Sequence, residues 1–276
     1  MTKTFLVATD LSPRADRAVQ RAFRLAGWLG ADLMLASVID EELPGEVAKP
    51  LAEAVELRLA RFAASVPHSG EVAHDTRVVA GDPAAAIPAL AAELGVDLVI
   101  LGVHRRRSLL DALRETTMER IVRHTTRPFL LVHDTVDHAY ATVLAALDFG
   151  PASTAALTLA AEIAPEADIH GVHALHVPYR GFVAPQASGG SAAPFRHDAE
   201  ARLASWRDCH PLPDRLREVA IVEGAAHHVL AERVAALTPD LLALGAHGRA
   251  GAAPSLLGSL ANEMMRNPPC DLLIAR

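Results

Sequence analysis

The stretch TPDLLALGAHGRAGAAPSLLGS, residues 238–259, decides the fold of this chain. Its apolar run Leu241–Leu244 ends at Gly245, and a glycine-containing turn then leads to Ser259 and a segment expected to be helical. A short continuous apolar run is typical of a strand that is covered on both faces of its sheet. A strand, a glycine loop and a helix in this order therefore predict one βα unit of a parallel sheet.

The same unit occurs earlier in the chain, in GVDLVILGVHRRR, residues 95–107. Two glycine pairs repeat at an offset of 143 residues and one aspartate pair at an offset of 138, namely Gly81/Gly224, Gly102/Gly245 and Asp10/Asp148. A nearly constant offset in three separate pairs indicates a tandem repeat. We therefore expect two domains, residues 1–136 and 140–276, joined by a short polar segment.

Each half alternates expected strands and helices, which is the pattern of a doubly wound α/β domain with a parallel sheet. The expected strands are 4–9, 33–39, 76–79, 98–101 and 129–132, then 143–147, 169–175, 219–222, 241–244 and 272–275. The expected helices are 13–29, 51–64, 83–94 and 116–124, then 153–163, 196–209, 225–237 and 259–266. Gly30 and Gly95 are placed as helix stops.

Composition limits the class of protein. Hydrophobic residues make up 51% of the 276 residues and aromatic residues 4%, so we expect a globular core of Ala, Leu and Val. A net charge of −7 argues against a nucleic-acid partner. No apolar window approaches ~18 residues, so no membrane span is expected and a cytoplasmic location is the default. The two cysteines form no CxxC pair or disulfide framework.

The histidines do not predict a metal site. His170, His173 and His176 alternate faces of one expected strand, and His227 and His228 are expected to point apart on a helix. No cysteine or carboxylate supports either group as a zinc site.

The glycine loop has the spacing G-x2-G-x9-G-S, carried by Gly245, Gly248, Gly258 and Ser259. Glycines allow the backbone to approach an anion closely, and the following helix start adds N–H donors and a partial positive charge. Each glycine alone is also explained by a turn, but a turn does not explain their joint spacing.

This motif, the opening Asp10-Leu11-Ser12 and the closing PCDLLIAR resemble the universal stress protein family. The resemblance covers the whole chain, twice. It implies two tandem, open, five-stranded, Rossmann-like parallel sheets in the order 3-2-1-4-5. It also implies that the last strands of the two domains pair, so that one chain forms a pseudo-dimer, with a further homodimer as an option.

The resemblance also implies a ligand, ATP or a related adenine nucleotide, with or without Mg²⁺, in the C-terminal domain only. Asp148 would face adenine, and Phe149 and Gly150 would flank the pocket. Gly245, Gly248, Gly258 and Ser259 would hold phosphates. Asp148 serves equally well as a helix cap.

The first half departs from the motif. Gly102 is kept, but Arg105 stands at the position of Gly248, and Glu115-Thr116 replace Gly258-Ser259. An arginine side chain would crowd a triphosphate, and a glutamate would itself satisfy the helix N-terminus. We therefore expect no ATP in this half, and Asp10 is better explained as a helix cap.

His104 and His247 occupy equivalent places. Because the first half keeps its histidine without the loop, a structural hydrogen bond is favoured over a contact from His247 to a phosphate.

Three functions are compatible with these residues. The first is a stress-response regulatory protein that binds a nucleotide and another protein, with little or no catalysis. The second is a scaffold that has lost nucleotide binding, and the third is a slow ATPase. The chain lacks GxxxxGK[ST] and GxSxG motifs, which argues against an efficient enzyme. The loop 178–194 is either a lid or a disordered excursion.

Overall fold

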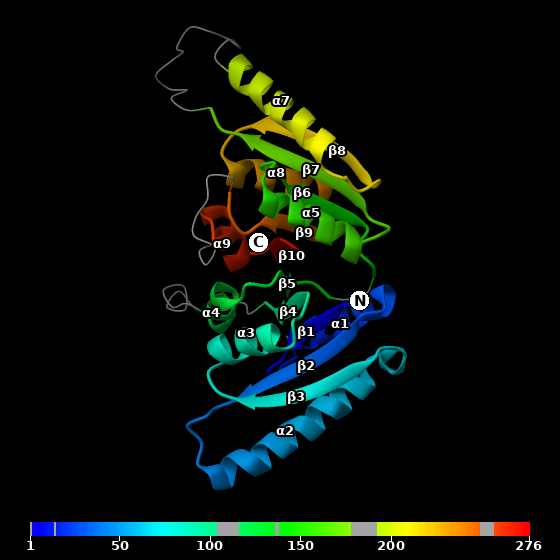
Figure 1. The fold of residues 1–276 in the computed structure, drawn as a ribbon, viewed down its shortest axis with the longest axis vertical. Coiled ribbons are helices and arrows are strands. Elements are labelled where there is room, and N and C mark those ends of the chain that lie inside the picture. The colour runs from blue at the N-terminus through cyan, green and yellow to red at the C-terminus, as the bar shows by residue number, and fades with distance from the viewer. Residues whose placement is uncertain (1, 14, 104–115, 136–137, 178–191, 249–256) are drawn as a thin grey trace. The chain divides into compact units, whose positions relative to one another are not determined.

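The structure, a computed structural model, describes residues 2–13, 15–103, 116–135, 138–177, 192–248 and 257–276 (Figure 1). The chain forms two compact units. The first is built chiefly from Met1–His138 and Met265–Leu273, and the second from Ala139–Ala253, Leu257–Met264 and Ile274–Arg276. Segments from near the C-terminus therefore belong to both units.

The first unit contains a parallel five-stranded sheet in the order β3-β2-β1-β4-β5. Its strands are β1 (Thr4–Ala8), β2 (Asp32–Ile39), β3 (His74–Ala80), β4 (Leu98–Gly102) and β5 (Phe129–Val132). Its helices are α1 (Ala15–Leu29), α2 (Gly45–Ser65), α3 (Pro83–Glu93) and α4 (Thr117–His124). The expected order 3-2-1-4-5 is confirmed for this half.

The second unit repeats the topology. Its strands are β6 (Thr142–Ala146), β7 (Asp168–Leu175), β8 (Leu216–Glu223), β9 (Leu241–Gly245) and the end of β10 (Asp271–Ala275). Strand β6 pairs in parallel with both β7 and β9, and β8 extends the sheet beyond β7. The Ala246 N–H donates to the Ala275 carbonyl at 2.7 Å, which places the end of β10 beside β9. The helices are α5 (Pro151–Ile163), α7 (Ala193–Cys209), α8 (Ala226–Leu237) and α9 (Ser259–Arg266).

Two glycines end helices as expected. Gly30 follows α1 with a φ of +59°, and Gly95 follows α3 with a φ of +63°. Beyond each glycine an N–H returns to the last turn, from Ala31 to Ala26 and from Val96 to Ala91. This is the Schellman arrangement, which needs the left-handed conformation that glycine adopts without strain.

Three helices begin earlier than the sequence predicts. Helices α2, α5 and α7 start at Gly45, Pro151 and Ala193, whereas starts at 51, 153 and 196 were expected. Proline in the first helical turn removes no intrahelical hydrogen bond, so Pro151 and Pro194 begin helices rather than interrupt the chain before them. Helix α2 also contains Pro50, and the prediction wrongly starts the helix after that residue.

The core of each unit is mainly aliphatic, as composition predicts. Phe5 and Phe129 are among the largest side chains that are fully buried, and leucine, isoleucine, valine and alanine supply most of the rest. Of the two cysteines, Cys209 is exposed and Cys270 is buried. Among the described residues, no helix is long and apolar enough to cross a membrane.

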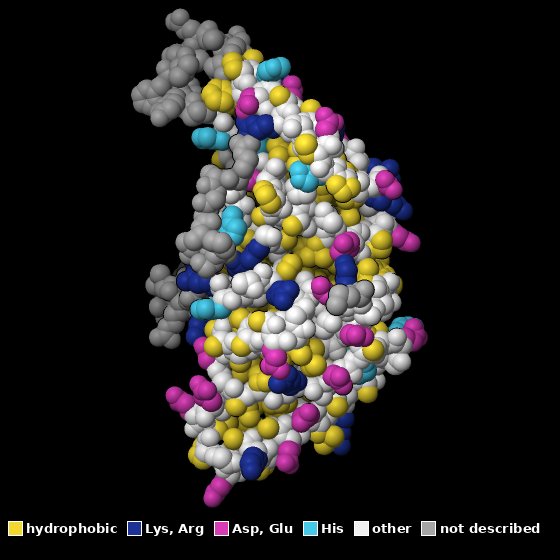
Figure 2. All heavy atoms as spheres, viewed as in Figure 1, with side chains coloured by type: hydrophobic (Ala, Val, Ile, Leu, Met, Phe, Trp, Pro, Cys, Tyr) yellow, Lys and Arg dark blue, Asp and Glu magenta, His cyan; other side chains and the backbone are white. Residues whose placement is uncertain are grey.

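Acidic and basic side chains both occur over the described atoms of the face in Figure 2.

The topology defines where a ligand can bind in each unit. Right-handed crossovers place α1 and α2 on one face of the first sheet and α3 and α4 on the other. The chain reverses its direction of winding between β1 and β4, and a crevice forms at the carboxyl ends of such neighbouring strands. The corresponding strands of the second unit are β6 and β9.

Candidate nucleotide site

Two segments of the second unit meet at the carboxyl ends of β6 and β9. Ala146, the last residue of β6, is in register with Leu244 of β9. Asp148 therefore emerges next to the loop that starts at Gly245. A Cβ atom built on Gly248 would lie 3.8 Å from Oδ2 of Asp148. The fold thus brings together the aspartate and the glycine loop that the motif singles out.

The Asp148 carboxylate is held by the start of α5. Its Oδ1 accepts a hydrogen bond from the Gly150 N–H at 2.9 Å and another from the Ser153 hydroxyl at 2.6 Å. Phe149 has a φ of +64°, so the chain turns sharply between Asp148 and the helix. Gly150 is the N-cap residue of α5 and has no side-chain cap of its own, so Asp148 does organise the start of this helix.

A cavity of about 250 Å³ lies beside Asp148. Six of the eight residues considered as candidate nucleotide contacts line it, namely Asp148, Gly245, His247, Gly248, Gly258 and Ser259. The cavity opens among the carboxyl ends of β6, β7 and β9 and the first turns of α8 and α9. The structure therefore assembles most of the expected site around one space.

The other two expected residues do not line this cavity. The Phe149 ring packs against His173, with centroids 4.6 Å apart, and against Trp206, with centroids 5.6 Å apart. Gly150 lies close beneath the carboxylate, since a Cβ atom there would be 3.1 Å from Oδ1 of Asp148. Both residues support Asp148 from outside the cavity, and their contact with a nucleotide stays a prediction.

Sequence reasoning missed an apolar wall and one buried hydroxyl. Helix α8 contributes Ala226, Val229 and Leu230, which follow the i, i+3, i+4 spacing of one helix face. That spacing was a signal by which the wall could have been found. Ser153 also lines the cavity, although it is only 3% exposed. An apolar wall in the same cavity as a carboxylate suits a flat organic ring that carries an amino group.

Glycine stands at the three positions of the loop for different physical reasons. A Cβ atom on Gly245 would lie 2.7 Å from the Ser153 nitrogen, so glycine is required there for α5 to approach β9. On Gly258 it would lie 3.4 Å from the Ala246 carbonyl oxygen, an ordinary contact, as is the 3.8 Å contact at Gly248. Packing thus explains Gly245 and does not explain Gly248 and Gly258, whose role in binding a ligand stays a prediction.

Helix starts surround the cavity. Ser153 lies in the first turn of α5, Ala226 begins α8 and Ser259 begins α9. The start of α5 already carries the Asp148 carboxylate, whereas the N-cap of α8 has no side-chain hydrogen bond. Uncapped N–H groups and the positive ends of helix dipoles favour an anion. The site can therefore offer acceptor, apolar and anion-binding groups within one small volume.

The histidines behave differently from expectation. The Nδ1 atom of His247 is buried and has no hydrogen-bond partner among the described residues, so the favoured structural hydrogen bond is not formed at this atom. His104 lies outside the described residues. The rings of His227 and His228 do not point apart, because their centroids are 4.1 Å apart. Within the described part of the chain, no group of three His, Cys, Asp or Glu residues is placed to hold a metal ion.

The corresponding position in the first unit differs. Asp10 Oδ1 accepts only the Ser12 N–H, at 3.0 Å, among the described residues, and Ser12 Oγ accepts the Ala15 N–H at 3.4 Å. The Ser12 side chain therefore accepts the hydrogen bond from the first turn of α1. The prediction that Asp10 itself caps α1 is wrong. Gly102 ends β4, and Arg105 and Glu115 lie outside the described residues.

In the first unit, side chains of the unit itself cap the starts of α3 and α4. Thr116 caps α4 in a capping box, where its hydroxyl accepts the Glu119 N–H at 3.2 Å and its N–H donates to Glu119 Oε2 at 2.7 Å. Glu119 is thus the acidic residue that satisfies the start of α4 in the structure. Asp82, the N-cap of α3, forms a two-point ion pair with Arg120 of α4.

Helices α3 and α4 therefore pack together, and the described residues of α8 and α9 show no comparable packing. Ala225 and Glu263 stand where the first half has Asp82 and Arg120, so that ion pair has no counterpart. The cavity of the second unit lies between the starts of α8 and α9.

Comparison with known proteins shows the same division of the chain. A model of the universal stress protein family matches residues 1–133 and 139–276. A universal stress protein of Mycobacterium tuberculosis is 27% identical over 190 residues, which cover 65% of this chain and 62% of that protein. The chain thus spans less than two thirds of that relative. Universal stress protein A homolog 1 of Coxiella burnetii is 31% identical over 143 residues, 49% of this chain and 94% of the relative.

Solved structures resemble the chain over almost its whole length. A universal stress protein from Archaeoglobus fulgidus covers 99% of this chain and 98% of its own, with a TM-score of 0.72 and 17% identity. A protein from Pseudomonas aeruginosa, described as a putative universal stress protein, covers 99% of this chain and 93% of its own, with a TM-score of 0.66 and 18% identity. At these identities the likeness shows the fold.

Proposed function

Because the chain belongs to the universal stress protein family, we propose that its second half binds ATP or a related adenine nucleotide in the cavity beside Asp148. The protein then acts as a stress-response regulator with little or no catalysis. The observation that carries this proposal is the convergence of Asp148, Gly248, Gly258 and Ser259 on one cavity. A further protein partner and a homodimer are part of the same proposal.

The residues present fit such a ligand. The carboxylate of Asp148 accepts a hydrogen bond from the amino group of adenine, and the apolar wall of α8 contacts the flat faces of the base. The Ser259 hydroxyl and the N–H groups at the starts of α8 and α9 meet phosphate oxygens. Mg²⁺ would arrive with the nucleotide and balance part of its charge.

The first half serves as an internal comparison. Its α3 and α4 starts are occupied by Asp82 with Arg120 and by Thr116 with Glu119. These groups satisfy the helix N-termini that would otherwise meet phosphates. We therefore propose one nucleotide per chain.

The experiment is a calorimetric titration of the full chain with ATP, with and without Mg²⁺. One site per chain supports the proposal. Two sites would overturn the assignment of the first half as non-binding. No heat of binding with ATP, ADP or AMP would overturn nucleotide binding and favour the alternative, a partner-binding scaffold.

Catalysis is tested separately by following phosphate release from the bound nucleotide. Turnover faster than about once per minute would show a working ATPase, since enzymes typically turn over at about 1 s⁻¹ or more. Slower turnover supports a regulatory role in which the bound nucleotide is held rather than consumed.

A further inference from the structure

Ser153 lies between the glycine loop and Asp148. It occupies the first turn of α5, where the residue is 3% exposed. Its hydroxyl oxygen is 2.6 Å from Oδ1 of Asp148 and 3.1 Å from the Gly150 carbonyl oxygen. A hydroxyl has a single hydrogen to donate, and the shorter, charge-assisted contact to the carboxylate takes it. The Asp148 N–H approaches the same hydroxyl oxygen at 3.4 Å, so the two residues are linked in both directions.

This arrangement orients the Asp148 carboxylate. Oδ1 receives the Ser153 hydroxyl and the Gly150 N–H, which come from the same helix start. With Oδ1 held at two points, Oδ2 is directed toward Gly248, where it lies 3.8 Å from the position of an added Cβ atom. A carboxylate fixed in this way presents one acceptor atom in one direction instead of rotating between rotamers.

The first half does not have the serine that holds the carboxylate. Ala15 stands at the position of Ser153, and Ser12 stands at the position of Gly150. Asp10 is exposed, and among the described residues its carboxylate accepts a hydrogen bond from the Ser12 N–H. The hydroxyl that orients the carboxylate therefore lies beside the cavity of the second unit, and Ala15 offers no such hydroxyl in the first.

We propose that Ser153 is a positioning residue for base selection. By holding Asp148, it fixes an acceptor that pairs with an exocyclic amino group and repels a carbonyl oxygen at the same place. The site then selects a 6-amino purine over a 6-oxo purine. This inference rests on the proposed function, because it requires the base to lie in the cavity beside Asp148. A ligand without the amino group would leave the carboxylate oxygen without a donor, which costs binding free energy. A hydrogen bond therefore discriminates between two bases more strongly than the shape of the pocket does.

The test compares ATP with ITP, which differ by the amino and oxo groups on the purine ring. Affinities are measured by calorimetry on the full chain and on Ser153→Ala. The wild-type protein should bind ATP at least about tenfold more tightly than ITP, as expected for one hydrogen bond to a charged group. Ser153→Ala should weaken ATP about tenfold and leave ITP nearly unchanged, so that the preference is lost.

Two further variants separate positioning from folding. Thr158→Ala removes another hydroxyl of α5, one that donates to the Thr154 carbonyl on an exposed part of the helix, and should leave both affinities unchanged. Asp148→Asn replaces an acceptor by a group that can also donate, and should shift the preference toward ITP.

The outcomes distinguish the two proposals. If Ser153→Ala weakens ATP and ITP by the same factor, or weakens neither, then Ser153 does not act on base selection and this inference is overturned, while nucleotide binding stands. If the wild-type protein binds neither ATP nor ITP, the proposed function itself is overturned, and base selection with it.

Discussion

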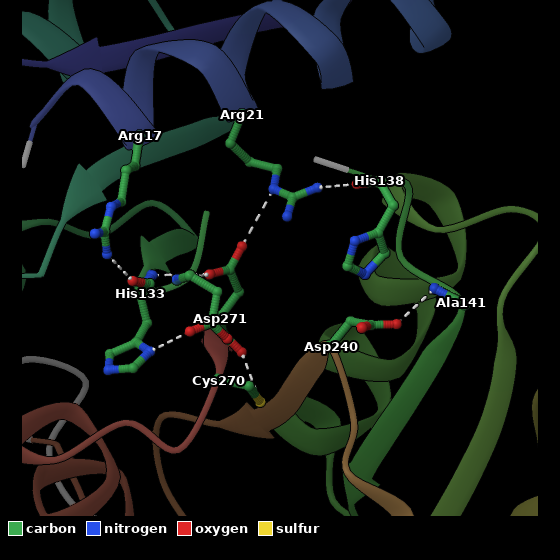
Figure 3. A network of polar contacts seen from close by, with 9 residues as sticks. Arg17, Arg21, His133, His138, Ala141, Asp240, Cys270 and Asp271 are labelled. Atoms are coloured by element: carbon green, nitrogen blue, oxygen red, sulfur yellow. Dashed lines mark hydrogen bonds and ion pairs between the residues drawn. The ribbon is translucent and has the colours of Figure 1, made fainter. Parts of the chain in front are cut away.

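The guanidinium of Arg21 lies 3.2 Å from the carboxylate of Asp271, and the two side chains are 3% and 0% exposed (Figure 3). Both residues belong to the first compact unit, although 250 positions separate them in the chain. Asp271 Oδ1 also accepts the N–H groups of His133 at 2.8 Å and Asp134 at 3.1 Å. Arg21 in turn donates to the His138 carbonyl at 3.0 Å. A residue near the C-terminus thus completes the polar interior of the N-terminal unit.

Replacing Asp271 by alanine should destabilise the first unit strongly. The change leaves the Arg21 cation buried without its carboxylate, and breaking a buried pair costs about 3–5 kcal/mol. The free energy of unfolding is measured by urea titration. The double variant Arg21→Met with Asp271→Leu should lose less free energy of unfolding than Asp271→Ala does, because no charge remains buried in it. A loss below about 1 kcal/mol for Asp271→Ala would contradict the buried pair, since exposed pairs contribute no more.

Gly245→Ala should destabilise the second unit through backbone crowding. The added Cβ atom would lie 2.7 Å from the Ser153 nitrogen, so α5 must move away from β9. We expect a loss of about 1–3 kcal/mol, the usual cost of overpacking. Thermal unfolding followed by circular dichroism measures it. Gly70→Ala is the matched control, because an added Cβ atom there meets nothing within 4 Å. Equal stability of the two variants would mean that α5 yields without cost.

The strands could be predicted from the sequence because each has a short apolar run and the whole pattern repeats, whereas their order 3-2-1-4-5 was implied by the family resemblance. The helix starts could not, where proline stands in the first turn of α5 and α7. Proline favours both a helix start and a chain break, and local sequence does not separate the two.

The glycine loop of the site was visible in the sequence because its spacing is local. The contact between Ser153 and Asp148 is also short in sequence, but its meaning depends on the sharp turn at Phe149. The role of Gly245 in packing against α5 joins two distant segments, so no sequence pattern shows it. The pairing of Asp82 with Arg120 was missed for the same reason.

The pKa of Asp16 offers a test of the charges near the first β-strand. Burial raises the pKa of this carboxyl, the negative charge of Asp10 raises it further, and Arg58 lowers it. Asp10→Asn should therefore lower the pKa of Asp16. It should remain above the ordinary value, because burial is the larger cause and is unchanged. Carboxyl chemical shifts in an NMR titration measure this. Asp75→Asn, an exposed change on β3, should leave the pKa of Asp16 where it was.

Gly258→Glu should abolish nucleotide binding by giving the second half the acid that the first half has at Glu115. The new carboxylate would stand at the start of α9, where it satisfies the helix dipole and repels phosphates. Gly258→Ala adds only a Cβ atom at 3.4 Å from the Ala246 carbonyl oxygen, so it should fold normally and bind more weakly than wild type by less than about tenfold.

Calorimetry with ATP measures both variants, and thermal unfolding confirms that each is folded. We expect a loss of at least about 100-fold for the glutamate, which corresponds to about 2.8 kcal/mol. Gly45→Glu is the control for added charge, since that glycine begins α2 in the other unit and has open space around it. It should bind ATP as the wild type does. Full affinity in a folded Gly258→Glu protein would mean that phosphates do not lie at the start of α9, and the loop would then serve only as a turn.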